Sequence, residues 1–249
     1  MRDENIVFGR NAVIELLKSG HSINRLLIAE GLRDGSIQMI IALASVNKIS
    51  VDFVPRDKLD KISDNQKHQG VIAFAAPVDY STLDDILAEA QSKNQPPFLL
   101  LLDEIQDPQN FGALLRTAEA VGVHGVLIPK HRSVSLNSTV AKTSAGAVEY
   151  VKVAQIGNVA QTLEQLKELG LTIVGGDLTG KSIFSNVELA CPIVLIIGNE
   201  GRGLRRLTKE NCDLLISIPM VGKINSLNAS AAGAVLMYEV FRQRTAVKQ

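Results

Sequence analysis

Two short, entirely apolar runs constrain the fold of this chain more than any other feature of its sequence. Residues 98–102 and 193–197 each contain five successive apolar side chains and no polar one. A run of this length is typical of a strand buried on both faces of a parallel sheet, and it is far too short to cross a bilayer. Helix-like and strand-like segments alternate around these runs, so we predict an α/β domain with a parallel sheet covered by helices. Further helices are expected at 110–121, 138–145, 159–168 and 226–242, and further strands at 125–128, 150–153, 171–174 and 214–218.

The first part of the chain shows the same alternation on a smaller scale. It predicts a small α/β domain over residues 1–76 with a mostly parallel sheet. The stretch 77–97 is polar, contains one amphipathic piece at 83–90 and closes with a double proline, so we expect a linker there. The larger domain is expected over 98–249.

The composition excludes some classes of protein. Lys plus Arg (26) equal Asp plus Glu (26), so the net charge is zero and the basic field of many nucleic-acid-binding proteins is missing. Any RNA contact must therefore come from local clusters, for which 130–132, 202–206 and Lys223 are candidates. Cys191 and Cys212 lack partners at metal-ligand spacing, so we expect reduced, buried thiols and no metal site. The charged start and the short apolar runs favour a cytoplasmic protein with no secretory signal and no membrane span.

One segment matches the phosphate-binding P-loop. Residues 175–182 fit G-x-x-x-x-G-K-[ST] letter for letter and follow a predicted strand, so a nucleotide hydrolase is a rival interpretation. A P-loop needs a substantial helix directly after its Lys-Ser, because the first N–H groups of that helix hold the phosphates. Only residues 183–190 separate this segment from Cys191-Pro192. We therefore expect a surface turn whose first glycines can line a ligand pocket, and we keep the hydrolase as a remote alternative.

The segment 103–117 follows the first apolar run. Asp107 and Pro108 turn the chain, and Asn110 is a good helix N-cap. Arg116 then falls near the carboxyl edge of the sheet, where a guanidinium can bind a phosphate through two hydrogen bonds. Taken alone, the segment is better explained as a capped helix with a solvated arginine.

Two later segments also follow predicted strands. In 197–204, three glycines permit close backbone approach to a ligand, in a spacing that differs from the dinucleotide fingerprint. In 218–230, a glycine loop leads into a helix that Asn225 or Ser226 could cap. Each segment alone is explained by an ordinary glycine turn or helix start.

Taken together, the three segments resemble the three motifs of one enzyme family. In order and spacing they are similar to the Asp-Pro-x-Asn-x-Gly…Arg-Thr, Gly-x-Glu-Gly-x-Gly and Ile-Pro-Met-x-Gly…Ser-Leu-Asn-x-Ser motifs of the SpoU (TrmH-like) branch of the SPOUT superfamily. The resemblance spans 98–249 and extends to 8–13 and 68–70, which look like that family's N-terminal RNA-binding domain. The departures are small: Phe111 stands where a Leu is frequent, and Thr143 replaces a common Ser.

The resemblance implies a fold, a cofactor and partners. The catalytic domain would be a parallel-sheet SPOUT domain with a deep trefoil knot, an exception to the rule against threaded chains. Its knot loops would bind S-adenosylmethionine, and the protein would be a homodimer with the site at the interface, to which the small-residue face of the last helix would contribute. By residue-for-residue resemblance, the cofactor would be held by Gly198, Ile218 and Leu227, with Gly176 at an adjacent strand end.

The resemblance also implies the reaction, which is methylation of an RNA ribose 2′-hydroxyl. The most similar subgroup acts on a guanosine of 23S ribosomal RNA. Arg116 is the family's candidate for activating the hydroxyl; because guanidinium stays protonated in proteins, we expect it to anchor a phosphate and stabilise charge. The polar frame around it would be built by Asn110, Glu200, Ser226 and Asn228.

Two alternatives remain open besides the P-loop hydrolase. Relatives that methylate transfer RNA share the same motifs, although they generally lack the front domain. A non-catalytic RNA-binding protein of the same fold is the other alternative, and the intact polar frame argues against it.

Overall fold

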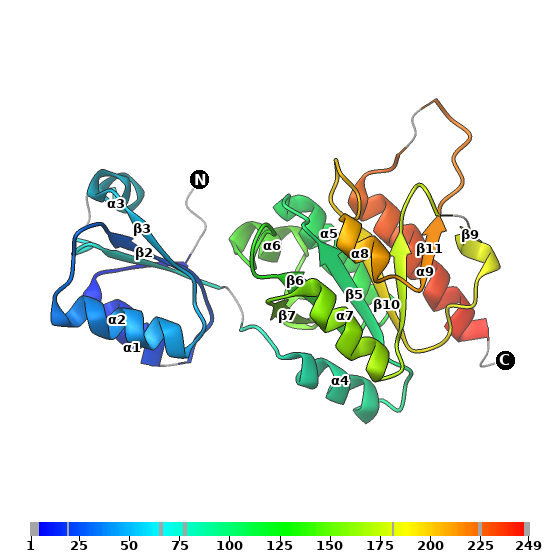
Figure 1. Ribbon diagram of the computed structural model, residues 1–249, viewed down its shortest axis with the longest axis horizontal. Coiled ribbons are helices and arrows are strands. Elements are labelled where there is room, and N and C mark those ends of the chain that lie inside the picture. The colour runs from blue at the N-terminus through cyan, green and yellow to red at the C-terminus, as the bar shows by residue number, and fades with distance from the viewer. Residues whose placement is uncertain are drawn as a thin grey trace. The chain divides into compact units, whose positions relative to one another are not determined.

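The structure, a computed structural model, describes residues 5–18, 20–64, 67–76, 79–180, 182–223 and 226–246. Its contacts divide the chain into two compact units (Figure 1). The first comprises Met1–Asp79 with Ser135–Ser138, and the second comprises Tyr80–Val134 with Thr139–Gln249. None of the helices in the described ranges is both long and apolar enough to span a membrane.

The first unit has a four-stranded sheet with helices packed on both faces. Leu26 and Ile28 of its second strand pack against the first two helices, whereas Leu27 and Ala29 pack toward the third. This alternation arises because successive side chains of a strand point to opposite faces. The elements are β1 (Asn5–Phe8), α1 (Arg10–Lys18), β2 (Ile23–Ala29), α2 (Gly35–Val46), β3 (Val51–Val54), α3 (Arg56–Ser63) and β4 (Val71–Ala75).

The sheet of the first unit is mixed, so the prediction of a mostly parallel sheet there is wrong. β4 lies between β1 and β2 and runs antiparallel to both, and only β2 and β3 pair in parallel. Alternating strands and helices become parallel only where each helix returns the chain to the opposite end of the sheet. α3 does not do so, because the chain enters β4 at the end where β2 and β3 finish, through a turn with positive φ at Gln69 and Gly70.

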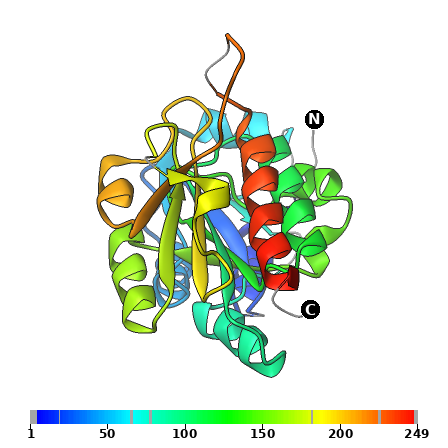
Figure 2. The ribbon, with the colours of Figure 1, turned by 90° about the vertical axis from the view of Figure 1, so that its right-hand side faces the viewer.

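The second unit contains a parallel sheet, as the two apolar runs predict. Its strand order is β7-β6-β5-β10-β8-β11-β9, and β5 and β10, which contain the two runs, lie side by side with every residue buried. Figure 2 shows α5 and α9 on one face of this sheet and α7 and α8 on the other. The elements are α4 (Leu83–Ser92), β5 (Phe98–Asp103), α5 (Pro108–Ala120), β6 (Gly125–Pro129), α6 (Ser138–Thr143), β7 (Lys152–Ile156), α7 (Val159–Glu168), β8 (Thr172–Gly176), β9 (Ser182–Ile183), β10 (Ile193–Gly198), α8 (Arg206–Glu210), β11 (Leu214–Ser217) and α9 (Ala229–Ala246), with 3-10 turns at Ala147–Glu149 and Phe184–Asn186.

The stretch expected to be a linker contains α4, which packs within the second unit. Thr82 and Asp85 form a capping box at the start of α4. Ile86 and Ala90 are fully buried, and Gly125 of β6 has no room for a side chain because Ile86 occupies that space. Residues from Tyr80 onward therefore belong to the second unit, while Pro77 lies outside the described residues.

Candidate active site

The candidate site lies at the carboxyl edge of the central strands of the second unit. Gly176, the last residue of β8, is paired with Ile197 of β10 on one side and with Ile216 of β11 on the other. The loops that follow these three strands therefore leave the sheet next to one another. In open α/β sheets this edge is where ligands bind.

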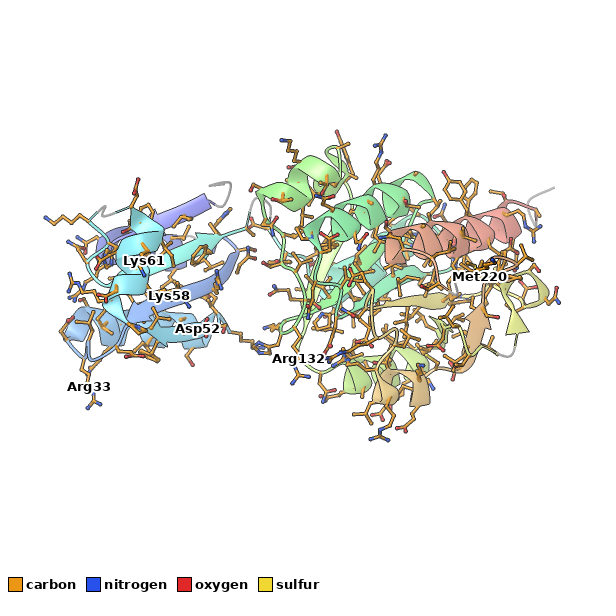
Figure 3. The ribbon with its side chains drawn as sticks, turned by 90° about the horizontal axis from the view of Figure 1, so that it is seen from above. Arg33, Asp52, Lys58, Lys61, Arg132 and Met220 are labelled. Carbon is orange, nitrogen blue, oxygen red and sulfur yellow. The ribbon has the colours of Figure 1, made fainter. Side chains whose placement is uncertain are left out.

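A cavity of about 320 Å³ opens at this edge and is lined by the three loops and the start of α9. Met220, labelled in Figure 3, belongs to the loop after β11 that forms one wall. We refer to this space as the cofactor cavity, because all four residues that the resemblance implies for the cofactor line it; their roles stay predictions. The lining includes Gly176, Gly198, Ile218 and Leu227, and also Glu200 and Ser226.

Two of these glycines have no room for a side chain. A Cβ at Gly198 would collide with the backbone of Gly203 and Leu204, because the loop doubles back on itself. Asn199 and Gly203 hold that reversal with two backbone hydrogen bonds, N to O, of 3.1 and 2.9 Å. At Gly176, a Cβ would lie 2.7 Å from Cδ1 of Leu236 on α9. Glycine at these two positions therefore allows the close packing of the strand ends against the loop and α9.

The first and second motifs meet through a hydrogen-bonded carboxylate. Asn110 Nδ2 donates to Glu200 Oε1 at 3.0 Å, and Asn199 Nδ2 donates to Glu200 Oε2 at 3.2 Å. The prediction that Asn110 caps its helix is wrong. Asp107 caps α5 by accepting from the N–H of Gln109 at 3.0 Å, with Pro108 as the first helical residue. Asn110 therefore points its amide at Glu200.

The two polar residues that the third motif contributes, Ser226 and Asn228, have different positions and contacts. Ser226 lines the cofactor cavity. Asn228 lies at the start of α9, where its Oδ1 accepts from the N–H of Ser230 at 2.9 Å and from the Ser230 hydroxyl at 2.6 Å. The helix therefore begins at Ala229, and the expectation that Ser226 caps it is wrong, while Asn225 lies outside the described residues.

Arg116 lies on α5 with an exposed side chain and is not among the residues that line the cofactor cavity. No hydrogen bond or ion pair of its guanidinium is found within the described ranges. The structure thus brings Asn110, Glu200 and Ser226 to one edge, and it leaves Arg116 pointing to solvent.

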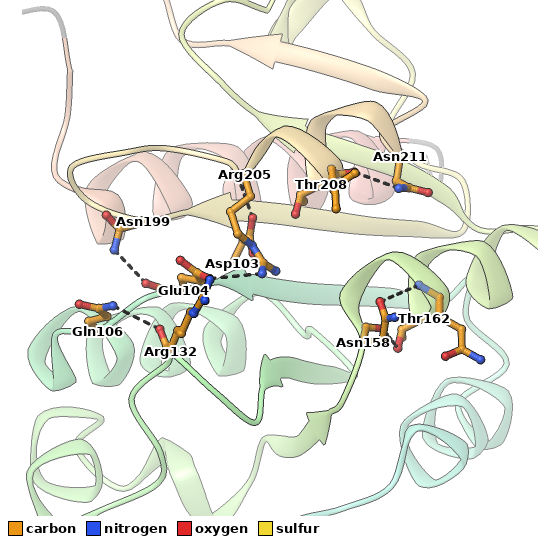
Figure 4. A network of polar contacts seen from close by, with 12 residues as sticks. Asp103, Glu104, Gln106, Arg132, Asn158, Thr162, Asn199, Arg205, Thr208 and Asn211 are labelled. Atoms are coloured by element: carbon orange, nitrogen blue, oxygen red, sulfur yellow. Dashed lines mark hydrogen bonds and ion pairs between the residues drawn. The ribbon is translucent and has the colours of Figure 1, made fainter.

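A buried ion pair, which the sequence did not single out, fixes the glycine loop to β5. Asp103 is completely buried and accepts from the N–H of Arg205 at 3.0 Å and from its Nε at 2.7 Å (Figure 4). Glu104 adds an ion pair to Arg205 Nη1 at 3.2 Å. The only sequence signal was an aspartate directly after a buried apolar strand.

A second missed ion pair lies in the wall of the cofactor cavity. Asp177 Oδ2 is 2.7 Å from Lys209 Nζ, and Asp177 Oδ1 accepts from the hydroxyl and N–H of Thr179. Burial tends to raise the pKa of Asp177, but the hydrogen bonds from Lys209 and Thr179 outweigh it and lower this pKa below its ordinary value. Asp177 is therefore a fixed negative charge that joins the loop after β8 to α8.

The segment that matches a P-loop does not form one. Gly180 packs against the backbone of β11 around Ile216, and Ser182 then opens β9, which pairs with β11. A 3-10 turn follows in place of a helix, so no row of helical N–H groups faces the loop. Lys181 lies outside the described residues.

In the first unit, the two family-like segments form one corner. Arg10 donates through its N–H to Gln69 Oε1 and through Nε to Gln69 O, both at 3.1 Å. His68 is buried; its Nδ1 accepts from the N–H of Gly70 at 3.0 Å, so its Nε2 donates to Asp60 at 2.7 Å. These contacts give both residues a structural role.

The cysteines are only partly buried. Burial raises the pKa of Cys212 to about 12, so it stays a thiol. Among the described residues, no three His, Cys, Asp or Glu side chains are placed to hold a metal ion.

Two family models match the chain. Residues 97–238 match the SpoU rRNA Methylase family, and residues 6–81 match a model described as RNA 2′-O ribose methyltransferase substrate binding.

Sequence relatives cover nearly the whole chain. YacO of Bacillus subtilis (strain 168), assigned to the TrmH family of tRNA/rRNA methyltransferases, is 48% identical over 246 residues, which are 99% of this chain and 98% of that protein. A protein of Staphylococcus saprophyticus assigned to the same family is 46% identical over 242 residues, which are 97% of each.

Solved structures share the fold. The SpoU methyltransferase AviRb from Streptomyces viridochromogenes, solved in complex with AdoMet, has a TM-score of 0.63 at 22% identity, over 98% of this chain and 92% of that one. The A. aeolicus TrmH/SpoU tRNA modifying enzyme has a TM-score of 0.57 at 31% identity, over 62% of this chain and 78% of that one. The family models and the extent of the sequence identity show that the chain belongs to the SpoU/TrmH family of RNA 2′-O-methyltransferases.

Proposed function

We propose that this protein transfers a methyl group from S-adenosylmethionine to the ribose 2′-oxygen of a guanosine in 23S ribosomal RNA. One observation carries the proposal. Residues from three separate segments, which the family resemblance implies for the cofactor, line a single cavity at the carboxyl edge of a parallel sheet.

The cofactor cavity suits S-adenosylmethionine in size and chemistry. About 320 Å³ is within the range of small-molecule sites. Its glycines present backbone groups, Ile197 and Leu236 supply apolar surface, and Glu200 supplies negative charge for a cation, whereas Lys209 balances the charge of Asp177. When bound there, the cofactor supplies a methyl group on a sulfonium, which is already a good leaving group.

The task left to the protein is to place and polarise the ribose hydroxyl. Asn110 and Asn199 orient the carboxylate of Glu200 at the mouth of the cavity. We assign Arg116 to bind an RNA phosphate and stabilise developing negative charge, since its exposed guanidinium can donate two hydrogen bonds to a phosphate. Ser226 and Asn228 complete the polar frame, Asn228 by fixing the start of α9.

Calorimetry tests the cofactor assignment against its rivals. The purified protein should bind S-adenosylmethionine with a measurable heat and should give none with ATP and Mg²⁺. Binding of ATP-Mg alone would favour the P-loop hydrolase, and binding of neither ligand would favour a non-catalytic RNA-binding protein.

We choose ribosomal RNA as the substrate because the chain has the N-terminal domain that relatives acting on transfer RNA generally lack. We assign residues 1–76 to RNA substrate binding, 77–97 to a connection and 98–249 to catalysis. Transfer RNA is the alternative substrate, and methyl transfer to each purified RNA separates the two. Because both RNAs are cytoplasmic in bacteria, we place the protein in the cytoplasm.

The outer face of α9 supports a homodimer. Val235, Tyr238 and Phe241 are 39%, 52% and 39% exposed, and the two aromatic rings pack edge to face. Apolar side chains grouped on one helix face are typical of an interface between protein chains. We assign this face to the dimer contact in place of the small-residue face of the same helix, because Gly233 of that face packs against Leu114 of α5 within the chain. The trefoil knot stays a prediction from the family.

A further inference from the structure

We propose that a second cavity, at the carboxyl ends of β6 and β7, binds backbone phosphates of the RNA substrate. The inference rests on the proposed function and adds the place where the RNA strand contacts the second unit. The cavity has a volume of about 700 Å³. Among the described residues that line it, every ionisable side chain is basic: His131, Arg132, Arg205 and Arg206. We call it the basic cavity.

The sheet brings these charges together from two distant segments. His131 and Arg132 follow β6, and Arg205 and Arg206 follow the loop after β10. Only β5 lies between β6 and β10, so their carboxyl ends are about 10 Å apart. Asp103, Glu104 and Glu210 pair with these arginines, so RNA binding here depends on phosphates replacing the weaker surface pairs and not on a net positive field.

Arg205 is the fixed member of the group. Its Nε and Nη2 contact Asp103 at 2.7 and 2.6 Å, and its Nη1 lies 3.2 Å from Glu104 (Figure 4). These two buried carboxylates hold its guanidinium, so Arg205 positions the wall and does not bind the phosphate itself.

Arg132 and Arg206 are the members able to bind a phosphate. Their side chains are 75% and 78% exposed. Arg132 Nη1 is 3.7 Å from Glu104 Oε1, beyond hydrogen-bond distance, and Arg206 pairs with Glu210 at the surface, where such pairs are weak. A phosphodiester offers each guanidinium two charge-assisted hydrogen bonds, which are stronger than these contacts.

The start of α7 forms another wall. Gly157, Asn158, Val159 and Ala160 line the cavity, and Figure 4 shows Asn158 at the start of α7, apart from Arg132 and Arg205. The N-terminus of a ten-residue helix carries partial positive charge, which adds to the attraction of the arginines for an anion.

The position relative to the cofactor cavity favours RNA over a free anion. One continuous segment serves both spaces, because Glu200 and Arg202 line the cofactor cavity while Arg205 and Arg206 line the basic cavity. An RNA strand that lies along this segment passes from the cofactor cavity to the basic cavity.

The double variant Arg132→Gln with Arg206→Gln tests the proposal. A matched control is Lys93→Gln with Lys152→Gln, which removes two charges at the amino edge of the same sheet, where both lysines pair with Glu89. Filter binding with a 23S RNA transcript and with bulk tRNA, over a series of KCl concentrations, gives the dissociation constant and its salt dependence. Calorimetry with S-adenosylmethionine checks that each variant is folded.

Loss of two phosphate contacts should weaken RNA binding about tenfold and lower the slope of log Kd against log salt by about 1.5, with cofactor affinity and the control unchanged. A double variant whose RNA affinity and salt slope equal those of the control overturns the proposal. Failure of the wild type to methylate any RNA rejects the proposed function instead.

Discussion

At the scale of single residues, the candidate site depends on which side chains are not needed for local structure. Asp107 caps α5, which leaves the amide of Asn110 for Glu200. Asn228 is used at the start of α9, so Ser226 is the polar residue of that motif that faces the cofactor cavity. The side chain of Arg116 is exposed, so its guanidinium is accessible to a phosphate of the RNA.

Arg116→Lys keeps the positive charge of this residue but removes the planar guanidinium, which can donate two parallel hydrogen bonds to one phosphate. We expect kcat for methyl transfer to fall about a hundredfold, because a single ammonium cannot hold a phosphate in two hydrogen bonds. Affinity for S-adenosylmethionine should not change, since Arg116 is not among the residues lining the cofactor cavity. Steady-state kinetics with Arg242→Lys, an exposed arginine of α9 that pairs with Glu239 and lines neither cavity, provides the comparison. Near-normal turnover would remove Arg116 from the mechanism.

At the scale of elements, close packing and side-chain hydrogen bonds fix the conformation of the loop after β10. Its backbone passes so close to itself that Gly198 has no space for a side chain, and Asn199 closes the turn by accepting from the N–H groups of Gly201 and Arg202. Asp103 and Arg205 fasten the far end of the loop to β5.

Gly198→Ala should therefore destabilise the second unit by about 3 kcal/mol, because the added methyl meets backbone that cannot rotate away. Gly201→Ala is the matched control from the same loop: the nearest atom to its Cβ is Asn199 Oδ1 at 3.7 Å, so the change should stay within about 0.5 kcal/mol. Urea unfolding of both variants measures the difference. Equal stabilities would show that the loop is not packed as described.

The sequence predicts the parallel sheet of the second unit because its two central strands, β5 and β10, contain short runs of apolar residues that are typical of strands buried on both faces. It does not predict β1 or β9, which are short, or the mixed sheet of the first unit, since strand direction depends on where a connection returns the chain. The amphipathic segment 83–90 is visible in the sequence, but only the packing of Ile86 against Gly125 shows that it belongs to the core. Of the candidate site, the family resemblance implies Gly176 and Gly198. The hydrogen bond between Asn110 and Glu200 could not be predicted, because it joins residues 90 positions apart.

At the scale of the whole molecule, a chain of zero net charge has to bind a polyanion through local features. The second unit has two such local features at one edge of its sheet, the cofactor cavity and the basic cavity. The first unit supplies the family's substrate-binding domain. The cofactor cavity and the proposed RNA-binding cavity therefore lie along the carboxyl ends of strands of the same sheet.

Mapping of ribose methylation tests this account most directly. RNA from a strain that lacks the protein would be treated with the purified enzyme and S-adenosylmethionine, and 2′-O-methyl groups would be located in 23S RNA and in tRNA. The account predicts one new 2′-O-methylguanosine in 23S RNA and none in RNA from the parent strain, which is already modified. A methyl group gained only by tRNA would contradict the assigned substrate, and RNA that gains no 2′-O-methyl group at all would contradict the central claim.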